Sequence, residues 1–483
     1  MASRSQRPVL AIALGALLPA IALGAVALYA QGKASPAKAA APPVTVPVQQ
    51  PAALTTPLLS VRRSPSVLAQ DLRTDLLVAN ATPLADSIGA SSCLSLSLDG
   101  RELVARNNDL LVIPASNLKI ITAAVALEVL GADFRFTTTV VGPAPINGVV
   151  DGDVYLVGGG DPVLSEQWYT QPNASRQRPP MHATSVEGLA DALVAAGVAQ
   201  VTGRIVGDDS RYDTERYPPD WANDVRVSLD GGAVGALVIN DSRSTNDAQS
   251  DQPAAKAAQT FAALLDDRGI AVGGSDASTA PAGLGVLASV QSAPLTDILN
   301  ELLATSDNLT AEMLVKEIGV AVAQSGTRAA GLQAMLDRLN TWGVPITGLV
   351  FADGSGLSHD NQLTCAALAA VLRRGSATDG VGAALAVAGQ EGSTLAGSFE
   401  QAGLVGVLQA KSGTLHNPNE VKSLSGYFVV SAPDEIEFVL LLNGASAVDY
   451  ATAWGQLAEA LLATAAGPEP DALGPSPWTA GTP

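Results

Sequence analysis

Residues 114–131 read PASNLKIITAAVALEVLG, an apolar run with one lysine and one glutamate. A proline before the run and a glycine at its end predict a helix that starts near Ser116 and stops at Gly131. The run is apolar nearly all round, so this helix is expected to be buried. Lys119 lies about one turn after Ser116 and would be a cation held against the core. A capping serine and a lysine that extends to water would explain the same residues structurally.

Two further short motifs follow in order, Ser306-Asp307-Asn308 and Lys411-Ser412-Gly413-Thr414. With Ser116 and Lys119 they complete the S-x-x-K, S-x-N and K-[ST]-G set of serine enzymes that D-alanyl peptides and β-lactams acylate. Ser35-Pro36-Ala37-Lys38 and Ser244-Thr245-Asn246 repeat the first two patterns, so each motif alone is weak evidence. The third motif occurs once, and the correct order of all three makes a chance match improbable.

The local context of the second and third motifs favours a catalytic interpretation without excluding a structural one. Ser306-Asp307-Asn308 is predicted to be a loop leading into a helix, and Lys411–Leu415 is predicted to begin a strand. The same residues would also suit a helix cap that includes Glu312, or an ordinary strand start. A P-loop is excluded, because Ala410 stands where a P-loop needs glycine and no helix follows.

Each motif residue suits a step of acyl transfer. Ser116, at a helix N-terminus, is the predicted nucleophile, and its own N–H and that of Thr414 would bind the oxyanion. Lys119 is the predicted base, and it must be neutral to accept a proton, so its pKa must fall below about 10.4 through burial and the nearby charge of Lys411. Ser306 can relay a proton to the leaving amine. Asn308 can bind a substrate amide. A terminal carboxylate would bind to Lys411, Ser412 and Thr414, with Gly413 between the last two.

Composition limits the other possibilities. The chain has 483 residues, which suggests two or three domains, and a formal net charge of −19 without a basic stripe, which argues against nucleic-acid binding. Three scattered histidines and two cysteines give no defensible metal site, and no cofactor is expected. Cys93 and Cys365 would form one disulfide in an exported protein or remain two buried thiols.

The two ends of the chain differ from its middle. Arg4 and Arg7 precede 23 uncharged residues, so residues 1–30 are predicted to be a signal peptide or a membrane anchor, and the protein to be exported to the cell envelope. Residues 31–65 are rich in alanine and proline and read as a spacer. Residues 467–483 are predicted to be a disordered tail.

The middle of the chain shows two kinds of secondary-structure pattern. Residues 66–131 and 291–466 combine helices with late antiparallel strands and a closing helix, which predicts an α/β catalytic domain with an antiparallel sheet flanked by helices. Residues 132–290 alternate short strand-like runs with Gly, Pro and Asp turns, interrupted by one helix at 186–195. This segment is predicted to be one or two inserted β-rich domains.

The chain resembles the D-alanyl-D-alanine carboxypeptidase/endopeptidase family, the class C low-molecular-mass penicillin-binding proteins of peptidase family S13. Besides the three motifs it shares Gly158–Pro162 and Asp353–Ser358, both typical of that family. The family fills the 190 residues between Ser116 and Ser306 with domains inserted into a transpeptidase fold like that of penicillin-binding proteins and β-lactamases. His359 stands where the family often has arginine, and Ser412 replaces the commoner threonine.

This resemblance implies an exported serine DD-peptidase that cleaves D-alanine or cross-links from peptidoglycan peptides and is acylated by β-lactams. A serine β-lactamase and a non-catalytic wall-binding protein remain as alternatives, and the sequence gives no oligomeric state. The segment Arg211-Tyr212-Asp213, with Trp221 nearby, would either bind the amino end of the stem peptide or form an ordinary surface loop. Carboxypeptidase and endopeptidase activity are not separable, because both use one acyl-enzyme.

Overall fold

The structure is a computed structural model, and it describes residues 65–171, 180–221, 223–227, 231–244, 249–401, 403–431 and 434–467. The predicted signal or anchor lies outside these residues, as do the spacer and the tail apart from their boundary residues Pro65 and Gly467. Within the described ranges, no helix combines the length and the apolar character needed to cross a membrane.

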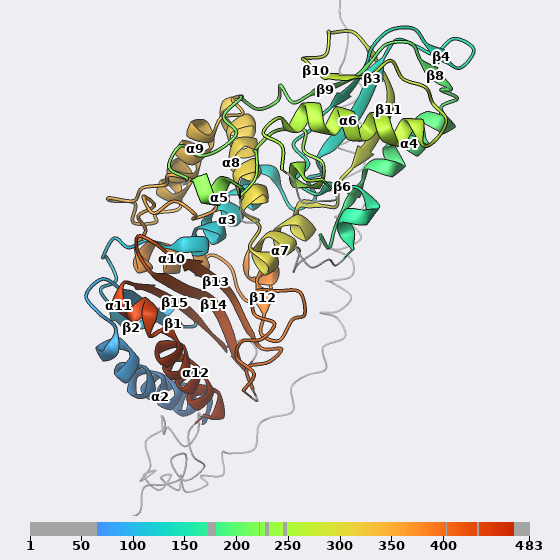
Figure 1. Cartoon of the computed structure of the whole chain (residues 1–483). Helices are drawn as coiled ribbons and strands as arrows, with labels where there is room; N and C mark the ends of the chain where they lie inside the picture. The colour runs from blue at the N-terminus through green and yellow to red at the C-terminus, as the bar shows by residue number, and fades with distance from the viewer. Residues whose placement is uncertain are drawn as a thin grey trace, which may run out of the picture. The chain divides into compact units, whose positions relative to one another are not determined.

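A six-stranded sheet forms the centre of the part of the chain that holds the three motifs (Figure 1). All neighbouring strands in it are antiparallel, and the early strand β1 pairs with the late strand β15. The ends of the described chain therefore meet in one sheet. The strand order is β12 (Ala386–Val387), β13 (Leu408–Leu415), β14 (Val421–Ser431), β15 (Asp434–Asn443), β1 (Cys93–Leu98) and β2 (Arg101–Arg106).

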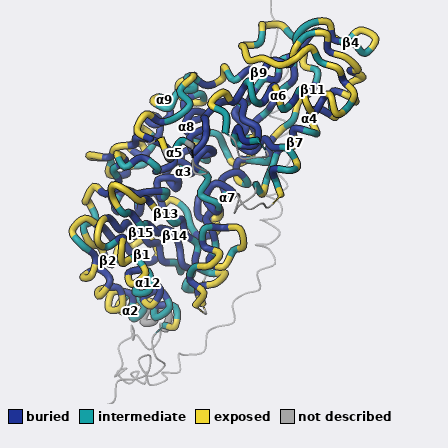
Figure 2. The backbone as a smooth tube through the Cα atoms, viewed as in Figure 1, coloured by how far each residue is buried: buried dark blue, intermediate teal, exposed yellow. Residues whose placement is uncertain are grey.

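Helices cover both faces of this sheet, as the sequence predicted for an α/β fold. Successive residues of a strand point to opposite faces, so Phe438 of β15 packs with α2 (Pro65–Ser87) and α12 (Tyr450–Ala466). Val439, the next residue, packs with helices on the other face. Burial on both sides explains the unbroken apolar run Phe438–Leu442 of β15, and Figure 2 shows the buried path of this strand.

The helix predicted from the run that follows Ser116 is confirmed as α3 (Leu118–Leu130), which ends at Gly131. A single turn of 3₁₀-helix, Ala115–Asn117, precedes it and contains the serine. Most residues of α3 are buried, because four other helices surround it on its side of the sheet. These are α7 (Leu295–Thr305), α8 (Asn308–Ala323), α9 (Arg328–Thr341) and α10 (Cys365–Leu372).

A disulfide joins Cys93 of β1 to Cys365 of α10, which resolves the alternative left open by the sequence. Both residues are fully buried, so the bond ties the sheet to the helical layer that contains α3. Helix α2 continues to Ser87 past Pro83, because Leu84 packs in the core beyond the proline.

A second, five-stranded sheet is built entirely from residues 137–291. Helices α4 (Val186–Ala195) and α6 (Pro253–Asp266) pack on it, and only the first of them was predicted from the sequence. We propose that residues 132–290 form the inserted domain. The strand order is β10 (Ser275–Ala277), β9 (Ile205–Asp208), β5 (Val154–Val157), β3 (Thr137–Gly142) and β11 (Gly285–Gln291), with parallel pairing only on either side of β9.

Asn443, at the end of β15, fixes the segment that leads to Ser116. Its side-chain oxygen accepts a hydrogen bond from Ile113 N at 3.0 Å, and its amide nitrogen donates to Ile113 O at 3.0 Å. Both residues are buried, so these backbone groups have no access to water. Asn443 therefore satisfies the polar backbone of the segment two residues before the 3₁₀ turn.

We predict that Asn443→Ala lowers the free energy of unfolding by about 1–3 kcal/mol, because it leaves the buried N–H and C=O of Ile113 unpaired. Urea unfolding of the purified protein measures this change. The matched control is Asn80→Ala on the exposed side of α2, which should change stability by less than about 0.5 kcal/mol. Equal effects of the two substitutions would contradict the role of Asn443.

Candidate active site

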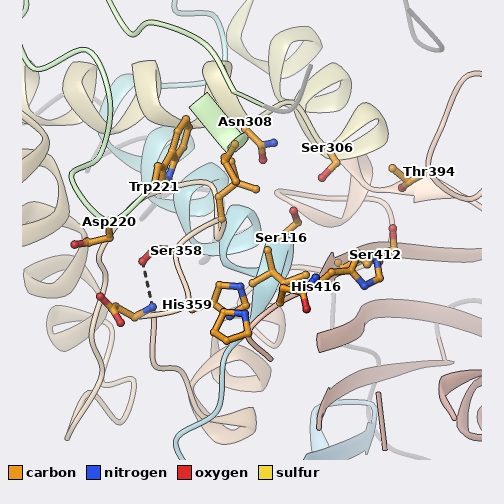
Figure 3. Close-up of a pocket in the computed structure, with 18 of the residues that line it drawn as sticks. Ser116, Asp220, Trp221, Ser306, Asn308, Ser358, His359, Thr394, Ser412 and His416 are labelled. Atoms are coloured by element: carbon orange, nitrogen blue, oxygen red, sulfur yellow. Dashed lines mark hydrogen bonds between the residues drawn. The ribbon is translucent and has the colours of Figure 1, made fainter. Parts of the chain in front are cut away.

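The three sequence motifs meet at one cavity of about 780 Å³ (Figure 3). Ser116 reaches it from the 3₁₀ turn, Ser306 and Asn308 from the junction of α7 and α8, and Ser412 from β13. Ser116 is partly exposed to the cavity, as a nucleophile must be. The duplicate motif at residues 35–38 lies outside the described residues, and Ser244 does not line this cavity.

Lys119 is fully buried, and its amine lies among three oxygen atoms. Its Nζ is 3.1 Å from Ser116 Oγ, 2.5 Å from Asn308 Oδ1 and 2.6 Å from the backbone oxygen of Ser355. The structural alternative, a lysine that extends to water, is therefore wrong. The capping alternative is also wrong, because Ser116 makes no side-chain cap bond to α3 and its Oγ contacts Lys119 instead.

Asn117 attaches the start of α3 to the sheet. Its fully buried amide donates hydrogen bonds to Lys411 O at 3.0 Å and to Ser423 Oγ at 2.7 Å. Ser116 is thereby held against β13 by the residue that follows it. Sequence analysis missed Asn117, because it occupies an unspecified position of S-x-x-K and its partners lie about 300 residues away.

The junction between α7 and α8 combines capping with chemistry. Ser306 ends α7 in a left-handed conformation (φ 67°), and Asp307 caps α8 by accepting a hydrogen bond from Thr310 N at 2.8 Å. The predicted cap thus exists, but it uses the middle residue of the motif. Ser306 lines the cavity, and Asn308 reaches Lys119. The predicted capping role of Glu312 is wrong, because its carboxylate binds a different loop.

The third motif lies on β13, whose backbone comes very close to Ser116. A Cβ atom added at Gly413 would lie 2.2 Å from Ser423 Oγ and 2.8 Å from Ser116 N, so only glycine fits there. Lys411 is fully buried and donates to Ser412 O at 2.6 Å. Ser412 and Thr414 line the cavity. The roles predicted for these residues in holding the oxyanion and the carboxylate stay predictions.

The loop Asp353–Ser358 holds the Lys119 side chain in place. Ser355 O accepts the hydrogen bond from Lys119, and two N–H groups of the loop, those of Gly354 and Ser355, donate to Glu312 Oε1 at 3.0 and 2.8 Å. Thr122 Oγ1, one turn further along α3, donates to Gly354 O at 2.7 Å. Helices α3 and α8 therefore fix the loop from two sides.

Asp353 organises the remainder of this loop and connects it to the segment 132–290. Its fully buried carboxylate accepts hydrogen bonds from Gly356 N at 2.8 Å and from Ser358 N at 2.6 Å. It also accepts one from Trp221 Nε1 at 2.9 Å. Trp221 lines the cavity together with its neighbour Asp220 (Figure 3). One wall of the cavity thus comes from the proposed inserted domain.

The segment Arg211-Tyr212-Asp213, which was open to a role in peptide binding or as an ordinary surface loop, is attached to α8. Arg211 and Tyr212 both bind Glu317 of α8, and Asp213 binds Lys316 at 2.6 Å. None of the three lines the cavity, so they attach this loop to α8 and leave Asp220 and Trp221 to face the site.

Burial and the neighbouring charge of Asp353 raise the pKa of Glu312 from 4.5 to about 8. The two backbone N–H bonds act in the opposite direction and do not offset the burial. A carboxyl group with such a pKa destabilises the fold when it ionises. Glu312, which binds the loop Asp353–Ser358, therefore lowers the stability of the fold as it ionises, whereas an apolar core residue would not.

Comparison with known proteins agrees with this geometry. The family model of the D-Ala-D-Ala carboxypeptidase 3 (S13) family matches residues 89–244 and 232–464. The chain is 32% identical to the D-alanyl-D-alanine carboxypeptidase of Actinomadura sp. (strain R39), over 78% of this chain and 81% of that protein. It is 30% identical to carboxypeptidase DacB of Mycolicibacterium smegmatis, over 92% of this chain and 94% of that protein.

Solved structures show the same fold. Penicillin binding protein 4 (dacB) of Haemophilus influenzae superposes with a TM-score of 0.63 at 20% identity, covering 76% of this chain and 93% of that one. The same Haemophilus protein has been solved in complex with a β-lactam, and that structure superposes with a TM-score of 0.55 at 20% identity and the same coverage. The predicted transpeptidase-like fold is confirmed.

We predict that Glu312→Gln flattens the pH dependence of stability. The native carboxyl group keeps a proton that the unfolded chain loses above about pH 4.5, so wild-type stability should fall as pH rises towards about 8. Glutamine can still accept hydrogen bonds from the loop but cannot ionise. The variant should therefore gain up to a few kcal/mol relative to wild type between pH 5 and pH 8.

Urea unfolding at both pH values measures this difference. Glu459→Gln, at an exposed position of α12, is the matched control and should leave the pH profile unchanged. Parallel profiles of wild type and Glu312→Gln would show that Glu312 does not cost stability as it ionises.

Proposed function

The chain belongs to the D-Ala-D-Ala carboxypeptidase 3 (S13) family, and we propose that it is a serine DD-peptidase acylated at Ser116. Its substrates are the D-alanyl ends of peptidoglycan stem peptides, and β-lactams acylate the same serine. One observation supports this assignment above the others. A fully buried lysine amine lies 3.1 Å from the hydroxyl of a serine that opens into a cavity.

Acylation begins with proton transfer from Ser116 Oγ to Lys119 Nζ. Removal of an amine from water favours its neutral form, which is the form that can accept a proton. Three oxygen atoms hold Nζ in place, so it needs little movement to act as the base. As Oγ bonds to the carbonyl carbon of the substrate, the proton passes to Nζ, and the carbonyl oxygen becomes an oxyanion.

Backbone N–H groups stabilise that oxyanion. Ser116 N lies at the start of α3, where unpaired N–H groups and the helix dipole favour negative charge. The close approach of Gly413 to Ser116 N brings β13 to the same point, and the next N–H on the strand is that of Thr414. Two such donors lower the barrier by several kcal/mol, roughly 3 for each donor.

Collapse of the tetrahedral intermediate returns the proton to the substrate. The C–N bond breaks, the leaving amine takes the proton that Lys119 holds, and Ser306 at the cavity wall relays it. Water then attacks the ester of the acyl-enzyme and gives its proton back through the same groups, which restores the Ser116 hydroxyl. Asn308, through its contact with Lys119, keeps the amine aligned through both steps.

The named relatives support carboxypeptidase activity as the principal reaction. Two proteins that share about a third of their residues with this chain are carboxypeptidases by name, and they align over most of their length. The leaving group of such a reaction is free D-alanine. Because peptidoglycan lies outside the cytoplasm, the proposed activity requires export, in agreement with the prediction for residues 1–30.

We predict that fluorescent penicillin labels the purified protein and that Ser116→Ala abolishes the labelling, because it removes the cavity hydroxyl that lies 3.1 Å from the Lys119 amine. Lys119→Met, which fills the buried volume without a base, should slow acylation about 100- to 10,000-fold. Ser278→Ala in an exposed loop of the inserted segment is the matched control. Labelling that survives in Ser116→Ala would refute the assignment of the nucleophile.

We predict that the protein releases D-alanine from a stem pentapeptide faster than it splits a cross-linked dimer. Mass spectrometry of the products from both substrates measures the preference. The penicilloyl-enzyme should persist for hours, since a peptidase deacylates it slowly. Rapid loss of the label with full recovery of free enzyme would instead indicate a β-lactamase.

A further inference from the structure

Thr414, at the edge of the active-site cavity, is paired with a lysine that belongs to none of the three motifs. Lys422 is the residue of β14 directly opposite Thr414 in the strand register. Its Nζ donates a hydrogen bond to Thr414 Oγ1 at 2.9 Å. Thr414 is exposed and lines the cavity, whereas Lys422 is partly buried behind it.

The described residues around Lys422 stabilise its positive charge but do not pair it with a carboxylate. Its Nζ lies 4.5 Å from the centre of the Tyr450 ring, close enough for a cation–π contact that steadies the side chain. Among the described residues, Lys422 forms no ion pair. Glu420, the acidic residue nearest along the strand, binds His416 Nδ1 at 2.7 Å. Partial burial lowers the pKa of Lys422, and the charge of Glu420 opposes this change.

The position of Thr414 matches the place where a substrate carboxylate must lie. In a peptide that ends in D-alanine, the terminal carboxyl carbon is three bonds from the carbonyl carbon under attack, at most about 4 Å away. Gly413 abuts Ser116 N, and Thr414 is one residue further, a Cα step of about 3.8 Å. A peptide bound at Ser116 therefore presents its carboxylate beside Thr414.

The hydrogen bond from Lys422 sets the direction of the Thr414 hydroxyl. A hydroxyl has one hydrogen and two lone pairs, and here one lone pair accepts from Nζ. The hydroxyl hydrogen must then point away from Lys422. Because the acceptor bond comes from a cation, the O–H group is polarised and becomes a stronger donor to an anion.

We propose that Lys422 and Thr414 act together as a carboxylate-recognition pair, with Thr414 in contact with the substrate anion and Lys422 positioning and polarising its hydroxyl. The proposal rests on the proposed peptidase function. The ligand is a carboxylate on the carbon attached to the scissile nitrogen. Free D-alanine termini and penicillins both have this group, whereas peptides with an amidated terminus do not.

The two lysines of this strand pair, Lys411 on β13 and Lys422 on β14, differ in how they can act on a carboxylate. Lys411 was predicted to attract the carboxylate, but it is fully buried and points its amine at backbone oxygen. Lys422 is partly exposed and lies behind Thr414, which lines the cavity, so it can act on an anion there through the Thr414 hydroxyl.

Kinetics with paired substrates test the proposal. Wild type, Lys422→Met and Lys422→Arg are compared on a peptide that ends in D-Ala-D-Ala and on the same peptide with a terminal amide. For Lys422→Met we expect kcat/KM to fall about 10- to 100-fold on the free acid and to stay within twofold on the amide. Lys422→Arg should recover most of the loss, because it keeps a donor and a charge. Lys256→Met on α6 is the matched control.

The ratio of acid to amide rates separates recognition from simple loss of structure, because a damaged fold slows both substrates alike. Equal losses on both, or no loss on the acid, would overturn the proposal. Acylation by benzylpenicillin and by its methyl ester gives a second readout that needs no peptidase activity. If wild type cleaves neither peptide, the proposed function fails. A preference for the penicillin acid over the ester that Lys422→Met removes would still support the carboxylate pair, and an equal preference in wild type and Lys422→Met would refute it.

Discussion

The burial of the Lys119 amine among oxygen atoms is the constraint on which the rest of the site depends. An amine with no access to water needs partners from several directions, and this one takes them from Ser116 in the turn before its helix, from Asn308 and from the backbone of Ser355. These partners belong to elements far apart in the chain. The junction of α7 and α8 and the loop after α9 must therefore both be placed accurately, because one supplies Asn308 Oδ1 and the other supplies Ser355 O to the same Lys119 Nζ.

A buried polar network beneath the site holds these oxygen atoms in position. Glu312 fixes the N–H groups of the loop whose carbonyl contacts Lys119, and Asp353 fixes the N–H groups that follow. Two carboxyl groups in a dry interior raise the free energy of the native state when both are ionised. The fold accepts this cost where it orients catalytic groups, as expected where function and stability compete.

The proposed inserted domain is more than an appendage, because it takes part in the same network. Trp221 donates to Asp353, and Arg211 and Tyr212 bind Glu317 of α8. A buried carboxylate that receives bonds from both parts of the chain couples their packing. The wall of the cavity that Asp220 and Trp221 supply is thereby held at a fixed relation to the loop that positions the base.

The sequence by itself determined the family and the kind of enzyme, and it predicted Ser116 and Lys119 as the reacting pair. Helical geometry brings residues three apart together, and the sequence placed Ser116 at the start of the helix that contains Lys119, so the two were predicted to be neighbours. Local sequence patterns likewise predicted the late antiparallel strands of the sheet, including the one that begins at Lys411. Only the tertiary structure decided which distant atoms meet: the oxygens around Lys119, the bonds of Asn117, the Cys93–Cys365 pair and the placement of Lys422 beside Thr414. Local patterns specify contacts within a helix or a strand, whereas contacts between elements depend on how separate elements pack, and no short stretch of sequence encodes that.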